Sequence, residues 1–273
     1  MAETDLGRKV FFLYPPSVIR DDLISRLMEH EYEVYMLKDI AVADKVIRLY
    51  PDSICFVNID AGMEEEKWEE WITKTLSDPS LSTLGIGIVS YNTDEGLQKK
   101  YLMDIGIQCG FIKLKLGLEE STRILLATLQ ANEARGRRKY VRANCALDNL
   151  SAINLRQGPI QAAGNLHDIS VVGFSCILDP DPAFSKGTVL RDIQLKLRAS
   201  LVRTEAVVYG MRQVEDRTMY VMLFKSKLED HATSKIRNYI QTALQMEIEL
   251  QAEQAESPAP AKTEEIRDEF LSL

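Results

Sequence analysis

Apolar residues in the first 130 positions are grouped in two ways that alternate along the chain. Five short apolar segments predict β-strands at 9–14, 32–37, 53–59, 84–90 and 107–114. The stretches after them carry apolar residues every three or four positions, which predicts helices near 17–27, 40–49, 64–76, 94–103 and 118–134. Strict alternation of strands and helices predicts a flavodoxin-like, doubly wound α/β domain with a parallel sheet.

The pattern changes after position 143, where short strand-like segments are separated by Pro, Gly and Asp residues. The segments that predict strands are 160–166, 173–178, 192–197, 199–209 and 218–224. Five or six antiparallel strands of this length predict a small β-barrel. Apolar residues at helical spacing then predict a C-terminal helix over 227–250, and the Glu-, Ala- and Pro-rich remainder predicts a disordered tail. The expected organisation is α/β plus all-β, with an α/β domain at 1–134, a barrel domain at 135–250 and a tail at 251–273.

Composition narrows the possible functions. A net charge of -8 argues against a general nucleic-acid binder, and no apolar run approaches the roughly 20 residues that cross a bilayer. The polar first residues do not resemble a signal peptide, so we expect a cytoplasmic protein. The four cysteines are scattered without a C-x-x-C pair, so we expect no metal site and no redox motif.

Two short motifs carry the chemistry of the chain. The first, R-x-x-x-R, spans Arg138–Arg142 within a basic cluster, and the second, D-x-S-x-x-G, spans Asp168–Gly173. Arginine forks suit phosphate oxygens and the O6/N7 edge of guanine, whereas a carboxylate accepts from the N–H groups of guanine. The aspartate and the serine share one face of an extended segment, and the glycine permits a turn or a close approach. Together the motifs predict a pocket for an anionic guanine nucleotide.

This pair of motifs resembles the PilZ family, whose members bind the bacterial second messenger cyclic di-GMP. The resemblance implies that the two arginines grip phosphates and guanine faces, with help from the arginine before them. It also implies that the carboxylate and the hydroxyl fix guanine and phosphate edges, while the glycine keeps the strand clear of the ligand. The implied ligand-binding residues are Arg137, Arg138, Arg142, Asp168, Ser170 and Gly173.

The first domain resembles a response-regulator receiver domain, but only in part. Lys113 matches the invariant lysine of that family, and Ser90 matches its Ser/Thr switch position. Leu13–Pro16 stands where the family has paired acids, and Asn58 aligns with the phosphoacceptor, with Asp60 two residues later. Magnesium needs several oxygen ligands, so we expect a pseudo-receiver that is not phosphorylated and that contacts a protein partner.

These observations lead to the hypothesis of a cyclic di-GMP receptor without catalytic residues or cofactor. His167 stands alone, without a metal or nucleophile partner, and is interpreted as a rim or packing residue. Because the basic segment directly follows the last helix of the first domain, ligand capture would order the joint between the domains. Two alternatives remain: a PilZ-fold adaptor that binds no nucleotide, and a regulator phosphorylated on Asp60 with the barrel as its output.

Overall fold

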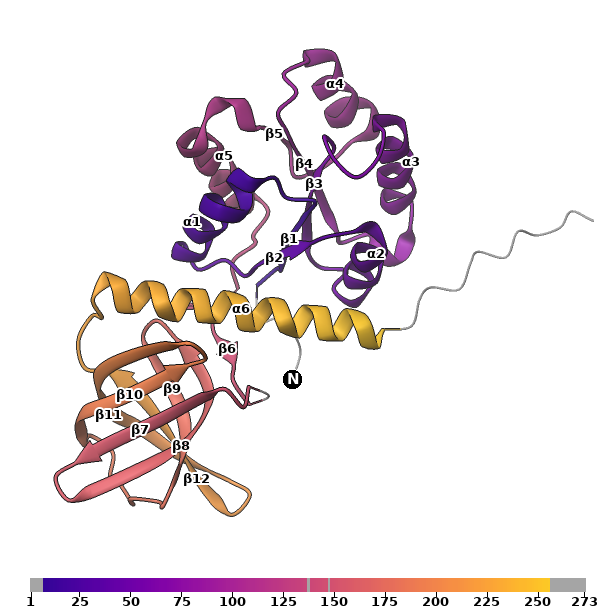
Figure 1. Cartoon of the computed structure of the whole chain (residues 1–273). Coiled ribbons are helices and arrows are strands. Elements are labelled where there is room, and N and C mark those ends of the chain that lie inside the picture. Colours follow the sequence, from indigo (N-terminus) through magenta and orange to yellow (C-terminus); the bar gives the residue numbers. More distant parts are fainter. Residues whose placement is uncertain (1–6, 137, 147, 256–273) are drawn as a thin grey trace, which may run out of the picture.

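The chain, analysed as a computed structural model, forms an α/β unit, a β-barrel and a long C-terminal helix (Figure 1). The structure describes residues 7–136, 138–146 and 148–255. Arg137, a predicted site residue, and most of the predicted tail, 256–273, lie outside the described residues. The arrangement confirms the predicted fold class of a parallel sheet followed by an antiparallel barrel and a helix. Among the described residues, none of the helices has both the length and the apolar character that a membrane crossing requires.

The α/β unit is built on a five-stranded parallel sheet in the order β2-β1-β3-β4-β5, as expected for the flavodoxin-like type. Three of its strands, β1, β3 and β4, consist entirely of buried residues, because helices lie on both faces of the sheet (Figure 1). The strands are β1 (Val10–Leu13), β2 (Val34–Leu37), β3 (Ile54–Asn58), β4 (Gly85–Ser90) and β5 (Phe111–Lys113). The helices are α1 (Ile24–Glu29), α2 (Ile40–Leu49), α3 (Glu65–Leu76), α4 (Glu95–Lys99) and α5 (Leu118–Ala131).

Short helical turns adjust the ends of some of these helices. A π-helical turn precedes α1 at Ile19–Leu23, and another extends α4 at Lys100–Ile105. Single 3-10 turns occupy Pro79–Leu81 and Leu114–Leu116. The helix predicted at 94–103 is therefore present as α4 together with its π-helical extension.

The barrel is a closed antiparallel sheet in the order β8-β7-β10-β11-β12-β9, in which β9 pairs back with β8. A two-residue strand, β6 (Ala143–Asn144), adds to the far end of β8. The prediction missed β7, in which only Ile153 and Leu155 provide large apolar side chains between polar ones. The barrel strands are β7 (Ser151–Gln157), β8 (Ile160–Ser170), β9 (Gly173–Asp179), β10 (Val189–Leu197), β11 (Ser200–Val214) and β12 (Arg217–Phe224).

The C-terminal helix, α6 (Asp230–Gln254), lies between the barrel and the α/β unit (Figure 1). It extends past the predicted domain end at 250, and it contacts β6, β8 and β11 of the barrel. It also contacts β2 and α2 of the α/β unit. A stripe of residues at spacings of three and four is buried along it: Ile236, Tyr239, Ile240, Leu244, Ile248 and Ala252.

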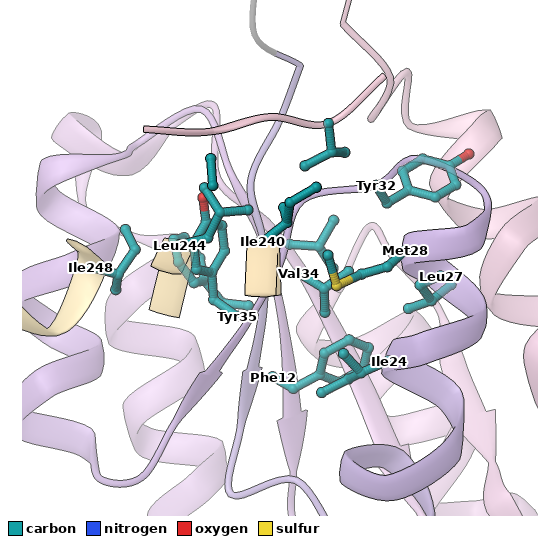
Figure 2. Close-up of a cluster of buried hydrophobic side chains, with 14 of the residues drawn as sticks. Phe12, Ile24, Leu27, Met28, Tyr32, Val34, Tyr35, Ile240, Leu244 and Ile248 are labelled. Atoms are coloured by element: carbon teal, nitrogen blue, oxygen red, sulfur yellow. The ribbon is translucent and has the colours of Figure 1, made fainter. Parts of the chain in front are cut away.

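The apolar stripe of α6 completes the core of the α/β unit. Figure 2 shows Ile240, Leu244 and Ile248 facing side chains of α1 and β2, including Val34 and Tyr35. The helix, which the predicted domain bounds assign to the barrel domain, also packs on β2 and α2 of the first unit. The helix therefore joins the two units through a shared apolar core.

Polar contacts of α6 protect the edge of the parallel sheet. The Gln245 side chain donates from Nε2 to the Met36 carbonyl (2.8 Å) and accepts at Oε1 from the Met36 backbone N–H (2.9 Å). Tyr50 of the α/β unit donates its hydroxyl to Gln251 Oε1 at 2.5 Å. Because β2 is an edge strand, the amide of Gln245 satisfies backbone groups that a neighbouring strand would otherwise pair.

Candidate functional site

The pairing of β6 with β8 brings the two sequence motifs together. In this antiparallel ladder Asn144 lies opposite Asp168. Ala143 lies opposite Ile169, so Arg142 comes directly before the paired residues. Residues that face each other across an antiparallel ladder have Cα atoms about 4.5–5.5 Å apart. The end of the arginine motif and the start of the second motif therefore occupy neighbouring positions on the barrel.

A β-bulge in β8 decides which way the second motif faces. The register between β8 and β9 shifts between Leu166 and Asp168, so His167 is the extra residue. Leu166 and Ile169 are 2% and 0% exposed and face the core. With strict alternation, Asp168 would share the inward face of Leu166, but the extra residue reverses the parity and sets Asp168 on the outer face.

The carboxylate of Asp168 is the partly open group of this site. Its side chain is 29% exposed, and His167 Nδ1 lies 3.9 Å from Asp168 Oδ2. The backbone N–H of Cys145 donates to the His167 carbonyl at 2.8 Å, which fixes the bulge. Asn144, directly across the ladder, accepts from the Ala146 N–H at 2.9 Å. Asn144 was not predicted as a site residue from the sequence. The only indication of such a role in the sequence is its position two residues after the arginine motif.

Ser170 and Gly173 form the turn between β8 and β9. Ser170 is 3% exposed, its hydroxyl donates to the Gly173 carbonyl (3.1 Å), and it accepts from the Val172 N–H (3.4 Å). A Cβ atom on Gly173 would lie 2.2 Å from the Met222 carbonyl oxygen of β12. The glycine is therefore required by the close approach of a barrel strand, and the serine holds the turn that presents the motif.

The basic segment before the barrel is docked on the α/β unit at the turn between α1 and β2. Arg135 donates from Nη2 to the His30 carbonyl at 2.7 Å, and its guanidinium lies 5.3 Å from the centre of the Tyr32 ring. The Val141 backbone N–H donates to Glu31 Oε2 at 2.9 Å. Both ends of the segment are thus held, so the joint between the units is a docked loop.

The two arginines of the first motif are exposed and lie in different surroundings. Arg142 leads directly into β6 beside the second motif. Arg138 lines a small hollow of about 20 Å³ together with Glu31 and Glu33 of the α/β unit. The structure therefore places one arginine at the barrel and the other against the neighbouring unit, and Arg137 lies outside the described residues.

A larger hollow, of about 520 Å³, lies on the barrel away from the motifs. Paired positions on three adjacent strands supply its polar walls, with Arg156 of β7 opposite Asp192 of β10 and Gln161 of β8. None of the predicted ligand residues that the structure describes lines it. The residues that line it are Asn154, Leu155, Arg156, Gln161, Ala162, Ala163, Asp179, Asp192 and Gln194.

The carboxyl end of the parallel sheet holds the residues aligned with a receiver phosphorylation site. Asn58 donates its amide to the Tyr14 carbonyl at 2.8 Å. The carboxylate of Asp60 accepts from the Ser90 hydroxyl and from the Tyr91 backbone N–H, both at 2.6 Å. Both carboxylate oxygens of Asp60 are therefore engaged by neighbouring residues.

The side chain of Tyr14, the residue after β1, packs against α3 and Gly62. The Tyr14 and Trp68 rings form a T-shaped pair with centroids 6.0 Å apart, and a Cβ atom on Gly62 would lie 2.6 Å from the Tyr14 ring. Ligands of open α/β sheets bind at the crevice beyond the carboxyl ends of the central strands, next to β1. Here the residue at the end of β1 is the aromatic Tyr14.

We expect acetyl phosphate with magnesium to leave the mass of the protein unchanged. Asp60 is held by Ser90 and Tyr91, and Tyr14 replaces the acids that would hold the metal. Intact mass spectrometry measures the outcome. A phosphorylated species that disappears in Asp60→Ala would contradict the prediction and favour the phosphorylated-regulator alternative.

The four cysteines offer no reactive thiol. All are free and buried. Burial raises the pKa of Cys55, Cys145 and Cys176 to about 12 and that of Cys109 to about 11. At neutral pH they remain protonated and unreactive. The parts of the chain that the structure describes contain no group of three or more Cys, His, Asp or Glu residues able to hold a metal ion.

Comparisons with known proteins find likeness in structure only. No family model matches the sequence, and no curated protein matches it. The PilZ domain of YcgR from Escherichia coli with cyclic di-GMP is 17% identical, with a TM-score of 0.37 over 44% of this chain and 99% of that chain.

Two further proteins are similar to this chain over about half of their own length. The Bacillus subtilis inhibitor of motility, MotI, is 19% identical, with a TM-score of 0.33 over 39% of this chain and 50% of that chain. The MrkH–cyclic di-GMP complex from K. pneumonia is 19% identical, with a TM-score of 0.34 over 44% of this chain and 56% of that chain. At such identities and scores the likeness is partial and says nothing about individual residues.

Proposed function

We propose that this protein is a cyclic di-GMP receptor whose site lies where β6 joins β8. The observation that supports the proposal is the ladder that puts Ala143 opposite Ile169 and Asn144 opposite Asp168, directly after Arg142. The end of the first motif thus lies beside the second motif, with Arg142 close in the chain to a partly exposed carboxylate. This combination suits an anionic ligand that also presents guanine N–H groups.

Each residue has a chemical role in this proposal. Arg138 and Arg142 bind phosphate oxygens and guanine edges through their planar forks, and Arg137 assists them. Asp168 accepts from guanine N1–H and N2–H₂. The second motif also contributes Ser170 and Gly173, which hold the β8–β9 turn close to the ligand.

The proposed role is that of a signalling receptor without catalytic activity. The α/β unit, with Tyr14 in place of the acids, serves as a pseudo-receiver that contacts a protein partner. Its partner is a protein and not a nucleic acid, because the net charge of -8 repels phosphate backbones. Because cyclic di-GMP is an intracellular messenger, the receptor acts in the cytoplasm.

A calorimetric titration of the full chain with cyclic di-GMP tests the proposal. We expect saturable binding with a defined number of ligands per chain. The protein and ligand concentrations are chosen so that micromolar binding would be detected. If the measured heat equals the heat of dilution, the receptor function is refuted and the adaptor that binds no nucleotide remains.

Asp168→Ala is expected to reduce the preference for guanine. Loss of a hydrogen bond to a charged group costs about 1.5–3 kcal/mol, so cyclic di-GMP should bind roughly ten- to a hundredfold more weakly. Binding of cyclic di-AMP, which lacks those N–H groups, should be weak in the parent and change little. Asp192→Ala, an exposed aspartate of the same barrel, is the matched control. Equal affinity of the parent for the two dinucleotides would contradict the role of Asp168.

A further inference from the structure

A single carboxylate of the α/β unit touches both the arginine segment and α6. Glu31 stands in the turn between α1 and β2 in a left-handed conformation, with φ of 62°. Its Oε2 accepts from the Val141 backbone N–H (2.9 Å), and its Oε1 accepts from Arg237 Nη2 of α6 (3.0 Å). The Glu31 side chain is only 15% exposed, so both contacts are shielded from solvent.

This carboxylate lies close to the groups proposed to bind the ligand. Val141 is the direct neighbour of Arg142, and Glu31 lines the same small hollow as Arg138. Glu33, the other acid of that hollow, is paired with Lys9 at 3.1 Å. A phosphate held by the two arginines would therefore approach the negative charge of Glu31.

Arg237 is the countercharge that offsets Glu31. Its side chain is 23% exposed, and its Nε is buried with no partner among the residues described. Near Arg237, α6 is tied to the barrel side through Tyr239, whose hydroxyl donates to Asp148 Oδ2 at 2.9 Å. The pair of Glu31 and Arg237 thus joins the α/β unit, the arginine segment and the helix that contacts the barrel.

We propose that Glu31 is a positioning residue of the nucleotide site and that the Glu31–Arg237 pair sets its affinity from the neighbouring unit. This inference rests on the proposed function. Glu31 holds the arginine segment through the Val141 N–H. Its negative charge repels an incoming anion, and Arg237 reduces that repulsion. The α/β unit is therefore part of the ligand site, and any partner that disturbs α6 or the α1–β2 turn changes ligand affinity.

Two charge-removing variants should shift affinity in opposite directions. Glu31→Gln keeps an acceptor for Val141 but removes the negative charge, so cyclic di-GMP should bind about three- to tenfold more tightly at low salt. Arg237→Gln leaves Glu31 without its countercharge, so binding should weaken by about the same factor. Both shifts should shrink as salt rises, because screening reduces each charge effect. Glu70→Gln removes an exposed charge from α3 of the same unit and should bind like the parent.

The directions of the two affinity changes distinguish an electrostatic effect from a loosened contact between Glu31, the arginine segment and α6. If both variants weaken binding, or if neither changes it, Glu31 is only a structural contact and the inference fails while the receptor stands. If the parent itself binds no cyclic di-GMP, the proposed function fails. Thermal unfolding of each variant identifies a loss of fold, and the double variant Glu31→Gln with Arg237→Gln then serves in place of the single ones. That double variant keeps an acceptor for the Val141 N–H and removes both charges, so parent-like affinity is expected; a lasting loss of binding in a folded protein would overturn the inference.

Discussion

Arg142→Ala is expected to weaken cyclic di-GMP binding by about ten- to a hundredfold, because a hydrogen bond to a charged group contributes roughly 1.5–3 kcal/mol. Arg142 enters β6 next to the second motif, so its guanidinium is carried by the strand that joins the two motifs. Arg138→Ala should have an effect of similar size. Calorimetric titration of each variant measures the loss.

Two further variants test whether the loss of binding is specific to the arginines of the motif. Arg142→Lys should not restore binding, because an ammonium group lacks the planar fork that meets phosphate or guanine through two bonds. Arg156→Ala removes an exposed arginine from β7 of the same barrel, outside both motifs, and should bind like the parent. Parent-like binding by both Arg138→Ala and Arg142→Ala would show that the ligand site is elsewhere.

Ile240→Ala in α6 is expected to lower the free energy of unfolding of the α/β unit by about 2–5 kcal/mol, as for other large-to-small changes in a core. Ile240 is 2% exposed and faces the α1–β2 side of the sheet, so the change leaves a cavity there (Figure 2). The two tryptophans of the chain, Trp68 and Trp71, both lie in α3 of that unit. Urea unfolding followed by tryptophan fluorescence therefore reports on the α/β unit directly.

The control for this helix is Met246→Ala. Met246 is 44% exposed, so its truncation should change stability by less than about 0.5 kcal/mol. If Ile240→Ala and Met246→Ala unfold at the same urea concentration by fluorescence, α6 does not complete the core of the α/β unit. In that case the helix would belong to the barrel alone, as its sequence position suggests.

The α/β unit was predictable because its strands are buried on both faces. Ile54–Asn58 and Gly85–Ser90 are continuous buried runs, and such runs between amphipathic helices admit few other folds. The strand Ser151–Gln157 was missed because two large apolar residues among polar ones give a weak alternation. Local patterns thus identify elements well where burial is complete and less well where one face is open to solvent.

Other features depend on contacts that no local pattern encodes. The spacing of the α6 stripe predicts a buried face, but not that Leu244 meets the first unit. The bulge at His167 turns Asp168 outward, and periodicity alone would have turned it inward. The motif residues could be named from the sequence, whereas the ladder that joins them through Asn144 needed the fold.

Hydrogen exchange of the full chain, with and without saturating cyclic di-GMP, tests the central claim most directly. If the receptor binds through the two motifs, protection should rise at 138–144 and 168–173 and stay unchanged in the remote strand Ile54–Asn58. The account would be contradicted if the ligand bound but hydrogen exchange stayed unchanged at both motif segments. It would also be contradicted if protection were confined to β7 and β10 around the larger hollow.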